Sequence, residues 1–517
     1  MAFAADLMRL CRAGWVLARE GVLPVIPFPE PMPAPLRAAL VLARLVQRPS
    51  AAGTDEAVRL TAAFNRLGPS YVKLGQFLAT RPDVVGARMA RDLTALQDNL
   101  PAFGEAAARA EIAAALGRPV EAVFSAFSPP IAAASIAQVH KASVVGPDGL
   151  ERDVAVKVLR PGVDRRFKAD LSAFYRVARL IERLHPPSKR LRPVAVVDTL
   201  ARSVALEMDF RLEAAGLSEM AENVAADEGF RVPEVDWTRS AKSVLVMEWV
   251  EGVKLSDLPG VAAAGHDGVV LGRLLLQSFL RHALRDGFFH ADMHQGNLFV
   301  DPQGTIVAVD FGIMGRLGVK ERRFLAEILY GFIVRDYVRV AEVHFEAGYV
   351  PRHHDVSSFA QALRAIGEPL QGHTAADISM ARLLNQLFEV TELFDMATRP
   401  ELILLQKTMV VVEGVARTLD PDLDMWKTAD PVVREWITRN LGPVGRIEDA
   451  GAHLKALWQL AETLPDLARR ADRIAARLDV EDAAEKAAVR VLSPSVTVAA
   501  WVAALSLAAI AVGLLSG

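Results

Sequence analysis

The stretch HADMHQGNLFVDPQGTIVAVDFG, residues 290–312, carries the side chains on which the fold and chemistry of this chain depend. Asp292 and Asn297 stand five positions apart in a predicted loop, and Asp310 follows a predicted pair of short strands. Phosphoryl transfer needs a divalent cation held by carboxylate and amide oxygens, beside a carboxylate that orients the nucleophile. The stretch therefore predicts a phosphoryl-transfer site, with Asp292 as the catalytic carboxylate and Asn297 and Asp310 as ligands of Mg²⁺.

The order Asp-x4-Asn, strand pair, Asp-Phe-Gly is that of the catalytic region of protein kinases. Two other interpretations stay open. One is a hairpin with ordinary turn-forming residues, and the other is a transition-metal cluster of His290, Asp292 and His294, whose alternate spacing can converge on one ion. Asn297 and Asp310 suit magnesium better than zinc, which favours the kinase interpretation.

A second motif, Val-Ala-Val-Lys at 154–157, predicts a strand lysine that reaches the α- and β-phosphates of a nucleotide. Such a lysine needs an acidic partner on a helix, and the segment EMDFRLE at 207–213 offers candidates. Asp209 and Glu213 share one helix face. We predict that Glu213 pairs with Lys157, although a solvent-facing strand lysine is the alternative for this motif taken alone.

The glycine-rich loop of conventional kinases is absent, because neither G-x-G-x-x-G nor a Walker A motif occurs in the chain. An alanine-rich stretch stands in its place, and the Ala-Pro-Glu motif expected after Asp310 for a protein-substrate platform is also missing. Nucleotide contacts are predicted for Lys157, for the alanine-rich region and for the junction of two lobes. The last two groups are Ala132, Ala133, Ala134, Ser135, Gln138 and Val139, and Met247, Glu248 and Val250.

These motifs resemble the UbiB/AarF/ADCK family of atypical kinases, which is linked to ubiquinone biosynthesis. The resemblance covers about residues 60–426. The segments that carry it are KLGQ at 73–76, the alanine-rich loop at 132–135, ExDxxxE at 207–213, HADxHxGN at 290–297 and EGVARTLDPD at 413–422. One departure is Gly216, where family members often have Asn.

The resemblance implies a helical extension that folds over the cleft, with Lys73 paired to Glu207 or Asp209 and with Gln76 on the same motif. It also implies ATP and Mg²⁺ as cofactors. The function it implies is a membrane-anchored kinase or ATPase that supports ubiquinone biosynthesis and acts on lipid-like quinone precursors rather than proteins. Membrane lipids and the intermediates and enzymes of that biosynthesis would be its partners, and a dimer stays open.

Two other functions remain as alternatives. Some family members carry the label of a polyprenylphenol hydroxylase, which would make this a redox enzyme. A flavin enzyme would show a glycine-rich dinucleotide fingerprint, and a carboxylate di-iron site would need two Glu-x-x-His pairs. The chain has no such fingerprint and one such pair, Glu182 to His185. The other alternative is a non-catalytic pseudokinase scaffold.

Composition places the body of the chain in the cytoplasm. The 517 residues carry 59 Lys and Arg against 62 Asp and Glu, a net charge of −3, which argues against a nucleic-acid binder. Cys11 is the one cysteine, so no intramolecular disulfide can form. Charged residues interrupt the first 26 positions, which argues against a signal peptide.

The tail differs from the rest of the chain, because residues 492–517 carry no charge. Its apolar core, 496–515, would span about 30 Å as a helix, the thickness of a bilayer's hydrocarbon core. We therefore predict a transmembrane anchor and a place at the bacterial inner membrane, with the catalytic body on the cytoplasmic side. A buried C-terminal helix is the alternative.

The predicted fold class is α+β: a mainly helical, two-lobed, protein-kinase-like fold with an N-terminal helical extension and a C-terminal transmembrane helix. The predicted divisions are an N-terminal helical region (1–55), the extension (56–128), a kinase-like N-lobe (129–252), a kinase-like C-lobe (253–430), amphipathic helices (431–491) and the anchor (492–517).

Overall fold

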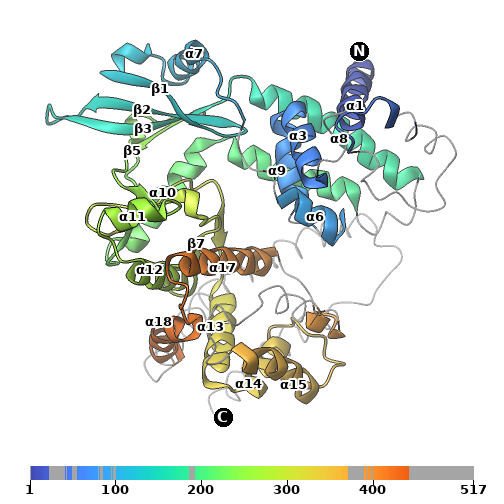
Figure 1. Ribbon diagram of the computed structural model, residues 1–517, viewed down its shortest axis with the longest axis vertical. Helices are drawn as coiled ribbons and strands as arrows, with labels where there is room; N and C mark the ends of the chain where they lie inside the picture. Colours follow the sequence, from blue (N-terminus) through green and yellow to red (C-terminus); the bar gives the residue numbers. More distant parts are fainter. Residues whose placement is uncertain are drawn as a thin grey trace, which may run out of the picture. The chain divides into compact units, whose positions relative to one another are not determined.

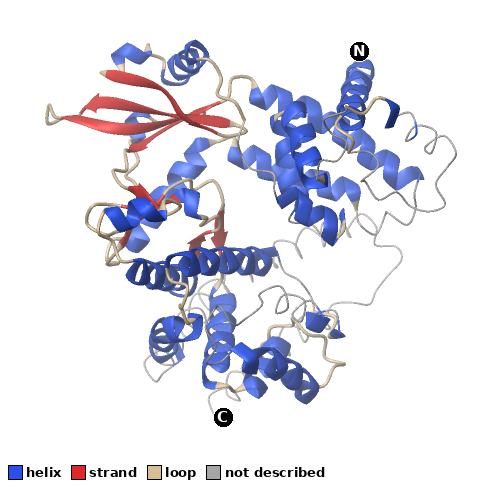
Figure 2. Ribbon diagram, in the orientation of Figure 1, coloured by secondary structure: helices blue, strands red, loops and turns tan. Residues whose placement is uncertain are grey.

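The structure is a computed structural model, shown in Figures 1 and 2. It describes residues 2–22, 41, 44–48, 55–79, 81, 85–94, 96, 100–184, 192–370, 389–391, 393–396 and 400–441. The chain divides into two compact units, Met1–Trp436 and Ile437–Gly517. The features described below lie in the first unit, apart from the last residues of one helix.

A four-stranded antiparallel sheet forms the β-rich lobe (Figure 2). Its strands in spatial order are β1 (Ala126–Ala133), β2 (Ala137–Val145), β3 (Glu151–Leu159) and β5 (Val244–Glu248). Strands β2 and β3 form a hairpin. Its turn places Gly149 at φ +77°, a left-handed conformation that glycine adopts without a steric penalty.

The two faces of this sheet have different roles. Side chains alternate between the faces of a strand, and Val156 of β3 is fully buried in a core with Ile112 of α7 (Glu105–Leu116). Lys157, the next residue, therefore points to the opposite face. Its register partner on β2 is Val139, which shares that face.

The helical lobe contains two smaller sheets, whose strands follow β5 in the chain except for β4, which precedes it. One has the order β4-β9-β8-β6 and the other pairs β10 with β7. These strands are β4 (Phe230–Arg231), β6 (Val253–Lys254), β7 (Phe288–His290), β8 (Leu298–Val300), β9 (Ile306–Ala308) and β10 (Met314–Arg316). Strands β8 and β9 confirm the strand pair predicted around the catalytic stretch.

Figure 1 labels the helices of this lobe. They are α11 (Leu258–Ala263), α12 (Gly268–Arg281), α13 (Val319–Val334), α14 (Tyr337–Glu346), α15 (Val356–Gly367), α17 (Pro400–Leu419) and α18 (Met425–Leu441). The described residues also form short helices of other kinds: the 3-10 turns η2 (Val120–Ala122), η4 (Trp237–Arg239), η6 (Gln295–Asn297) and η7 (Glu368–Leu370), and the π-helix η5 (His282–Asp286). Helices α12 and α17 pack closely, because a Cβ at Gly272 would lie only 2.8 Å from the carbonyl oxygen of Ala416.

The N-terminal helices pack with a pair of helices that comes later in the chain. The first group is α1 (Ala2–Arg19), α3 (Glu56–Leu67), α4 (Pro69–Ala79) and α6 (Ala87–Thr94), and the later pair is α8 (Val163–Leu184) and α9 (Pro193–Glu207). Tyr71 of α4 meets Phe174 of α8 edge-to-face, with ring centroids 5.1 Å apart. Helix α10 (Phe210–Val224) then leads back to the β-rich lobe.

The predicted C-terminal anchor, 492–517, lies outside the described residues, as does most of the predicted amphipathic region 431–491. Helix α18 runs across the predicted boundary at 430/431 without a break. Among the helices that the structure describes, none combines the length and the apolar character needed to cross a bilayer. The anchor therefore stays a prediction.

Candidate functional site

Three charged side chains from distant parts of the sequence meet at the face of the four-stranded sheet that carries Lys157. Lys157 Nζ lies 2.7 Å from Glu213 Oε1 and 2.8 Å from Asp310 Oδ1. The Lys157 and Glu213 side chains are 12% and 6% exposed, whereas the Asp310 side chain is 51% exposed. The pair predicted from the sequence, Lys157 with Glu213, is thus present, and Asp310 joins it from the side that faces solvent.

Local backbone structure explains how these side chains converge. Glu213 lies in the first turn of α10, whose N-cap is Asp209. Asp310 follows β9 after one residue and has a φ of +64°, which is uncommon for a residue other than glycine. Such strained residues concentrate at functional sites, where the surrounding structure holds them.

The charges in this cluster depend on one another. Burial disfavours the charged form of Lys157, but Asp310 and Glu213 outweigh it, so the pKa of the ammonium is raised. The Lys157 charge holds the pKa of Asp310 well below its usual range. Burial raises the pKa of Glu213, against the attraction of Lys157. Lys157 therefore remains a cation, with one buried and one accessible carboxyl partner.

The predicted catalytic loop is held from inside by His290. The ring accepts a hydrogen bond from the Asp292 backbone N–H at its Nδ1 (3.0 Å), and Nε2 donates to the Val309 carbonyl (3.1 Å). Burial lowers the pKa of His290, which keeps the ring neutral, as this pair of hydrogen bonds requires. His290 thus fixes the backbone at Asp292 and at the residue before Asp310.

Asn297 lies against the same loop. Its Nδ2 donates to the Asp292 carbonyl (3.2 Å), and its backbone carbonyl accepts from the Val309 N–H (2.9 Å). Its Oδ1 takes no hydrogen bond from the part of the chain that the structure describes. A hard cation would use that oxygen and a carboxylate oxygen of Asp310, so the donor set fits magnesium.

The alternative of a transition-metal cluster at His290, Asp292 and His294 does not fit this geometry. Both ring nitrogens of His290 are engaged in hydrogen bonds with the backbone, which leaves neither free to bind a metal. Among the described residues, the histidine and carboxylate donors that lie close enough together to share one ion belong to a different group.

The alanine-rich loop is the tight connection between β1 and β2. Ala134 N–H donates to the Ala137 carbonyl at 2.8 Å. Arg160, at the end of β3, contacts this turn from beneath: its guanidinium donates to the carbonyls of Ala134 and Ser135, both at 3.2 Å, and to that of Pro101 at 3.0 Å. No sequence motif distinguishes Arg160 from the other arginines, so its contact with this turn was not predicted.

The remaining predicted nucleotide contacts divide by the face of the sheet on which they lie. Val139 is on the Lys157 face, and Met247 shares that face as the register partner of Ala155. Gln138 is on the opposite face and fully buried, where its Oε1 accepts the Phe103 N–H at 2.9 Å. Its side chain is therefore turned away from Lys157.

Three other predicted contacts, Ala132, Ala133 and Val250, lie at the ends of two strands: Ala132 and Ala133 end β1, and Val250 follows β5. The Glu248 carboxylate is bound to Arg231 at 2.9 Å, and its N–H donates to the Glu234 carbonyl at 2.8 Å. Glu248 pairs with Val154 of β3, so its side chain lies on the face of the sheet opposite Lys157.

The predicted extension motif reaches the segment 207–213. Lys73 Nζ lies 2.7 Å from Glu207 Oε2, and both side chains are 14% exposed. Asp209 instead caps α10 and binds Arg211, whose side chain lowers the Asp209 pKa. Of the two partners left open for Lys73, the structure shows Glu207. Gln76 lies on the same helix, half-buried.

Comparison with known proteins shows the family of the chain. Residues 95–344 match the ABC1 atypical kinase-like domain, and residues 363–424 match the UbiB helical domain. A probable protein kinase UbiB from Marinobacter nauticus is 39% identical over 89% of this chain and 84% of its own length. The chain belongs to the UbiB family. A second UbiB relative, from Xanthomonas euvesicatoria pv. vesicatoria, is 38% identical over 80% of this chain and 76% of its own length.

A solved structure supports the kinase-like fold of this UbiB-family chain. It is the complex of Rv3197 with erythromycin from Mycobacterium tuberculosis, 27% identical, with a TM-score of 0.51, covering 70% of this chain and 90% of that one. The fold predicted from the sequence, a kinase-like arrangement of mixed helix and sheet, is confirmed at this level.

The UbiB helical domain also contributes to the site. Thr408 of α17 is buried, and its hydroxyl lies 3.1 Å from the carbonyl oxygen of Ala291, the residue before Asp292. The hydroxyl also lies 2.8 Å from the Leu404 carbonyl in its own helix. Thr408 stands 117 positions from Ala291, and no sequence motif pointed to it.

Proposed function

We propose that this protein is an ATP-dependent atypical kinase or ATPase that supports ubiquinone biosynthesis at a membrane. The observation that carries the proposal is the contact of Lys157 with both Glu213 and Asp310, which the kinase assignment requires. Lys157 and Asp310 are 153 positions apart in the sequence. Membership of the UbiB family supports phosphoryl transfer as the chemistry.

Each residue has a role that its surroundings support. Lys157 would bind the α- and β-phosphates, while buried Glu213 holds its ammonium in place. Asp292, fixed by His290, would accept the proton of the attacking hydroxyl or water. Asn297 and Asp310 would hold Mg²⁺, which when bound neutralises charge that develops on the phosphate oxygens.

The unequal exposure of the Asp310 and Glu213 side chains implies a conformational step when a nucleotide binds. Asp310 and a phosphate group would compete for the same cation, Lys157. Since Asp310 is half exposed and Glu213 is not, the incoming phosphate displaces Asp310, which becomes free to bind the metal. Lys157 keeps Glu213 as its partner throughout.

The acceptor proposed is a lipid-like quinone precursor or water rather than a protein. The missing Ala-Pro-Glu platform and the family resemblance both support this proposal. The uncharged segment 492–517 would hold the protein at the membrane where such precursors reside.

The experiment is ADP release from Mg-ATP by the full chain on liposomes, with and without phenolic quinone precursors. We expect turnover that depends on Mg²⁺ and falls at least 100-fold in Asp310→Asn and Asp292→Asn. Asp422→Asn, an exposed turn residue, serves as the matched control. Equal turnover in wild type and Asp310→Asn would reject the catalytic assignment in favour of the scaffold, and a flavin spectrum or stoichiometric iron would favour the redox alternative.

The membrane part of the proposal has a separate test. Removing 493–517 is expected to move the protein from the membrane fraction to the soluble fraction. A truncated protein that still sediments with membranes would shift the assignment to the amphipathic region 431–491.

A further inference from the structure

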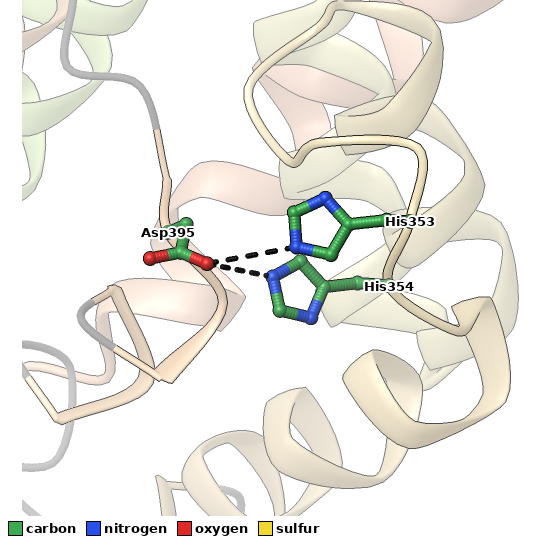
Figure 3. Close-up of side chains that lie close together, drawn as sticks. All are labelled: His353, His354 and Asp395. Atoms are coloured by element: carbon green, nitrogen blue, oxygen red, sulfur yellow. Dashed lines mark hydrogen bonds and ion pairs between the residues drawn. The ribbon is translucent and has the colours of Figure 1, made fainter.

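A second group of side chains with metal-ligating atoms consists of His353 and His354, in the loop between α14 and α15, and Asp395, in the segment 393–396 (Figure 3). His353 Nε2 is 3.6 Å and His354 Nε2 is 3.2 Å from the same oxygen of Asp395, and all three donor atoms lie within 4.8 Å of one another. Figure 3 shows both imidazole rings directed at that carboxylate from the opposite segment.

We propose that His353, His354 and Asp395 form a binding site for a divalent transition-metal ion of the zinc type. Two imidazoles and one carboxylate are the donors of zinc sites that keep a fourth position open. At zinc bond lengths of about 2.0–2.1 Å, tetrahedral donors lie about 3.3–3.4 Å apart. The two nitrogen-to-oxygen distances lie on either side of that value.

The donors are held in place by their own segments. His354 N–H donates to the Pro351 carbonyl at 3.2 Å, and Asp355 caps α15 through the Ser358 N–H at 2.8 Å. The loop that carries the two histidines is therefore fixed on both sides. A site that needs little rearrangement loses little free energy on ordering when the metal binds.

The segment that carries the Asp395 carboxylate is also anchored by its neighbours. Phe394, the neighbour of Asp395, is buried in one core with Phe359 of α15, with ring centroids 4.9 Å apart. The His354 ring packs on Phe394 at 5.3 Å, and Asp395 itself has a φ of +46°. The site thus joins the segment 393–396 to the α14–α15 loop through a shared core.

The donor set also selects the metal. Nitrogen donors disfavour magnesium and calcium, which take oxygen ligands. The His353 and Asp395 side chains are each 67% exposed, so an ion can enter from solvent. The site is independent of the phosphoryl-transfer proposal, because it shares no residue with the cleft.

The test uses the full chain, stripped of metal and free of nucleotide, since ATP itself binds divalent metals. Co²⁺ serves as the spectroscopic probe and Zn²⁺ as the competitor. We expect a tetrahedral Co²⁺ spectrum that Zn²⁺ abolishes and a large excess of Mg²⁺ does not. X-ray absorption on the zinc form is expected to show nitrogen and oxygen neighbours at about 2.0–2.1 Å.

Variants decide whether these residues are the site. His354→Ala and Asp395→Asn are expected to weaken Zn²⁺ binding at least 10-fold, while His266→Ala, a histidine elsewhere in the lobe, leaves it unchanged. Thermal unfolding in EDTA checks that the variants fold, and Zn²⁺ is expected to slow hydrogen exchange at 389–396 in wild type alone. Zinc binding that is absent in wild type, or equal in wild type and Asp395→Asn, would overturn the proposal.

Discussion

At the scale of single residues, the site rests on one cation shared by two unequal carboxylates. Glu213 is buried, so losing its ion pair with Lys157 would leave a carboxylate without solvation and would cost free energy. Half of the Asp310 side chain is exposed, so water can replace Lys157 as its partner. Lys157 therefore has a structural role toward Glu213 and a chemical role toward the cleft. The two roles can be separated by mutation.

We predict that Lys157→Met costs about 3 kcal/mol of unfolding free energy, because it leaves Glu213 buried without its counter-ion. Adding Glu213→Gln is expected to return most of that stability but none of the ATP turnover. Chemical denaturation and turnover measured on the same preparations check both halves. If the double variant is less stable than Lys157→Met alone, the buried pair is not the source of the loss.

A second residue-scale prediction concerns acid. Burial lowers the pKa of His290, and also that of His140 and His344. Below about pH 6.5 the unfolded chain takes up protons that these folded rings refuse, so stability falls as pH falls, by at most about 1.4 kcal/mol per pH unit for each ring. The raised pKa values of Glu213 and Glu413 have the opposite effect on stability, because the folded state binds their protons more readily than the unfolded chain does. That effect belongs to the pH range in which carboxyl groups titrate.

The measurement is the thermal unfolding midpoint of wild type and His290→Asn at pH 7.5 and 5.5. The midpoint of wild type is expected to drop on acidification, and the drop is expected to be smaller in His290→Asn, which has lost one of the three rings. A midpoint that rises toward pH 5.5, or an identical drop in the variant, contradicts this account.

At the scale of elements, α17 is the least expected contributor to the site. Thr408 places a buried hydroxyl against the carbonyl that precedes Asp292, so the helical domain supports the catalytic loop from outside the kinase-like core. We predict that Thr408→Val lowers ATP turnover about 10-fold, because removing one buried hydrogen bond costs about 1–1.5 kcal/mol. The expected change is in kcat rather than in the KM for ATP.

The same helix provides the control. The Thr418 hydroxyl donates to the Gly414 carbonyl within α17 at 2.8 Å and is exposed. Thr418→Val removes a hydrogen bond of the same kind without a contact to the loop, and turnover is expected to stay unchanged. Equal effects of the two substitutions would mean that α17 acts through its own stability alone.

The elements also show which parts of the site the sequence can predict. Lys157, Asp292, Asn297 and Asp310 lie in short segments whose residue types follow from phosphoryl-transfer chemistry. Their convergence then follows from the order of these segments along the chain.

What the sequence missed depends on contacts between distant segments. Arg160 and Thr408 act through backbone carbonyls, which carry no residue identity and so leave no pattern in the sequence. For Gln138 the sequence indicates the strand, but the face on which its side chain lies follows only from the register with β3 and the core on that side of the sheet. Helix α8 meets α1 through Ser172 and Asp6, which are 166 positions apart.

At the scale of the whole molecule, the segment 207–213 links the N-terminal helices to the cluster of Lys157, Glu213 and Asp310. Glu207 at one end binds Lys73 of α4, Glu213 at the other end binds Lys157 of β3, and Asp209 between them caps α10. A shift of α4 would therefore be transmitted over six residues to Glu213, the partner of the lysine that we propose binds phosphate.

We predict that Lys73→Met and Glu207→Gln act as one unit. Each single variant is expected to lower the free energy of unfolding by about 1–3 kcal/mol, because it leaves a largely buried partner without its hydrogen bond. The double variant is expected to lose no more stability than the less stable of the two single variants. The exposed pair Arg434 and Asp430 of α18 is the control, with an expected coupling of about 0.5 kcal/mol or less.

ATP turnover should follow the same non-additive pattern if the link reaches Glu213. Turnover losses that add in the double variant would mean that Lys73 influences the cleft by a route other than Glu207, such as its charge acting directly on Asp310, whose pKa it helps to lower.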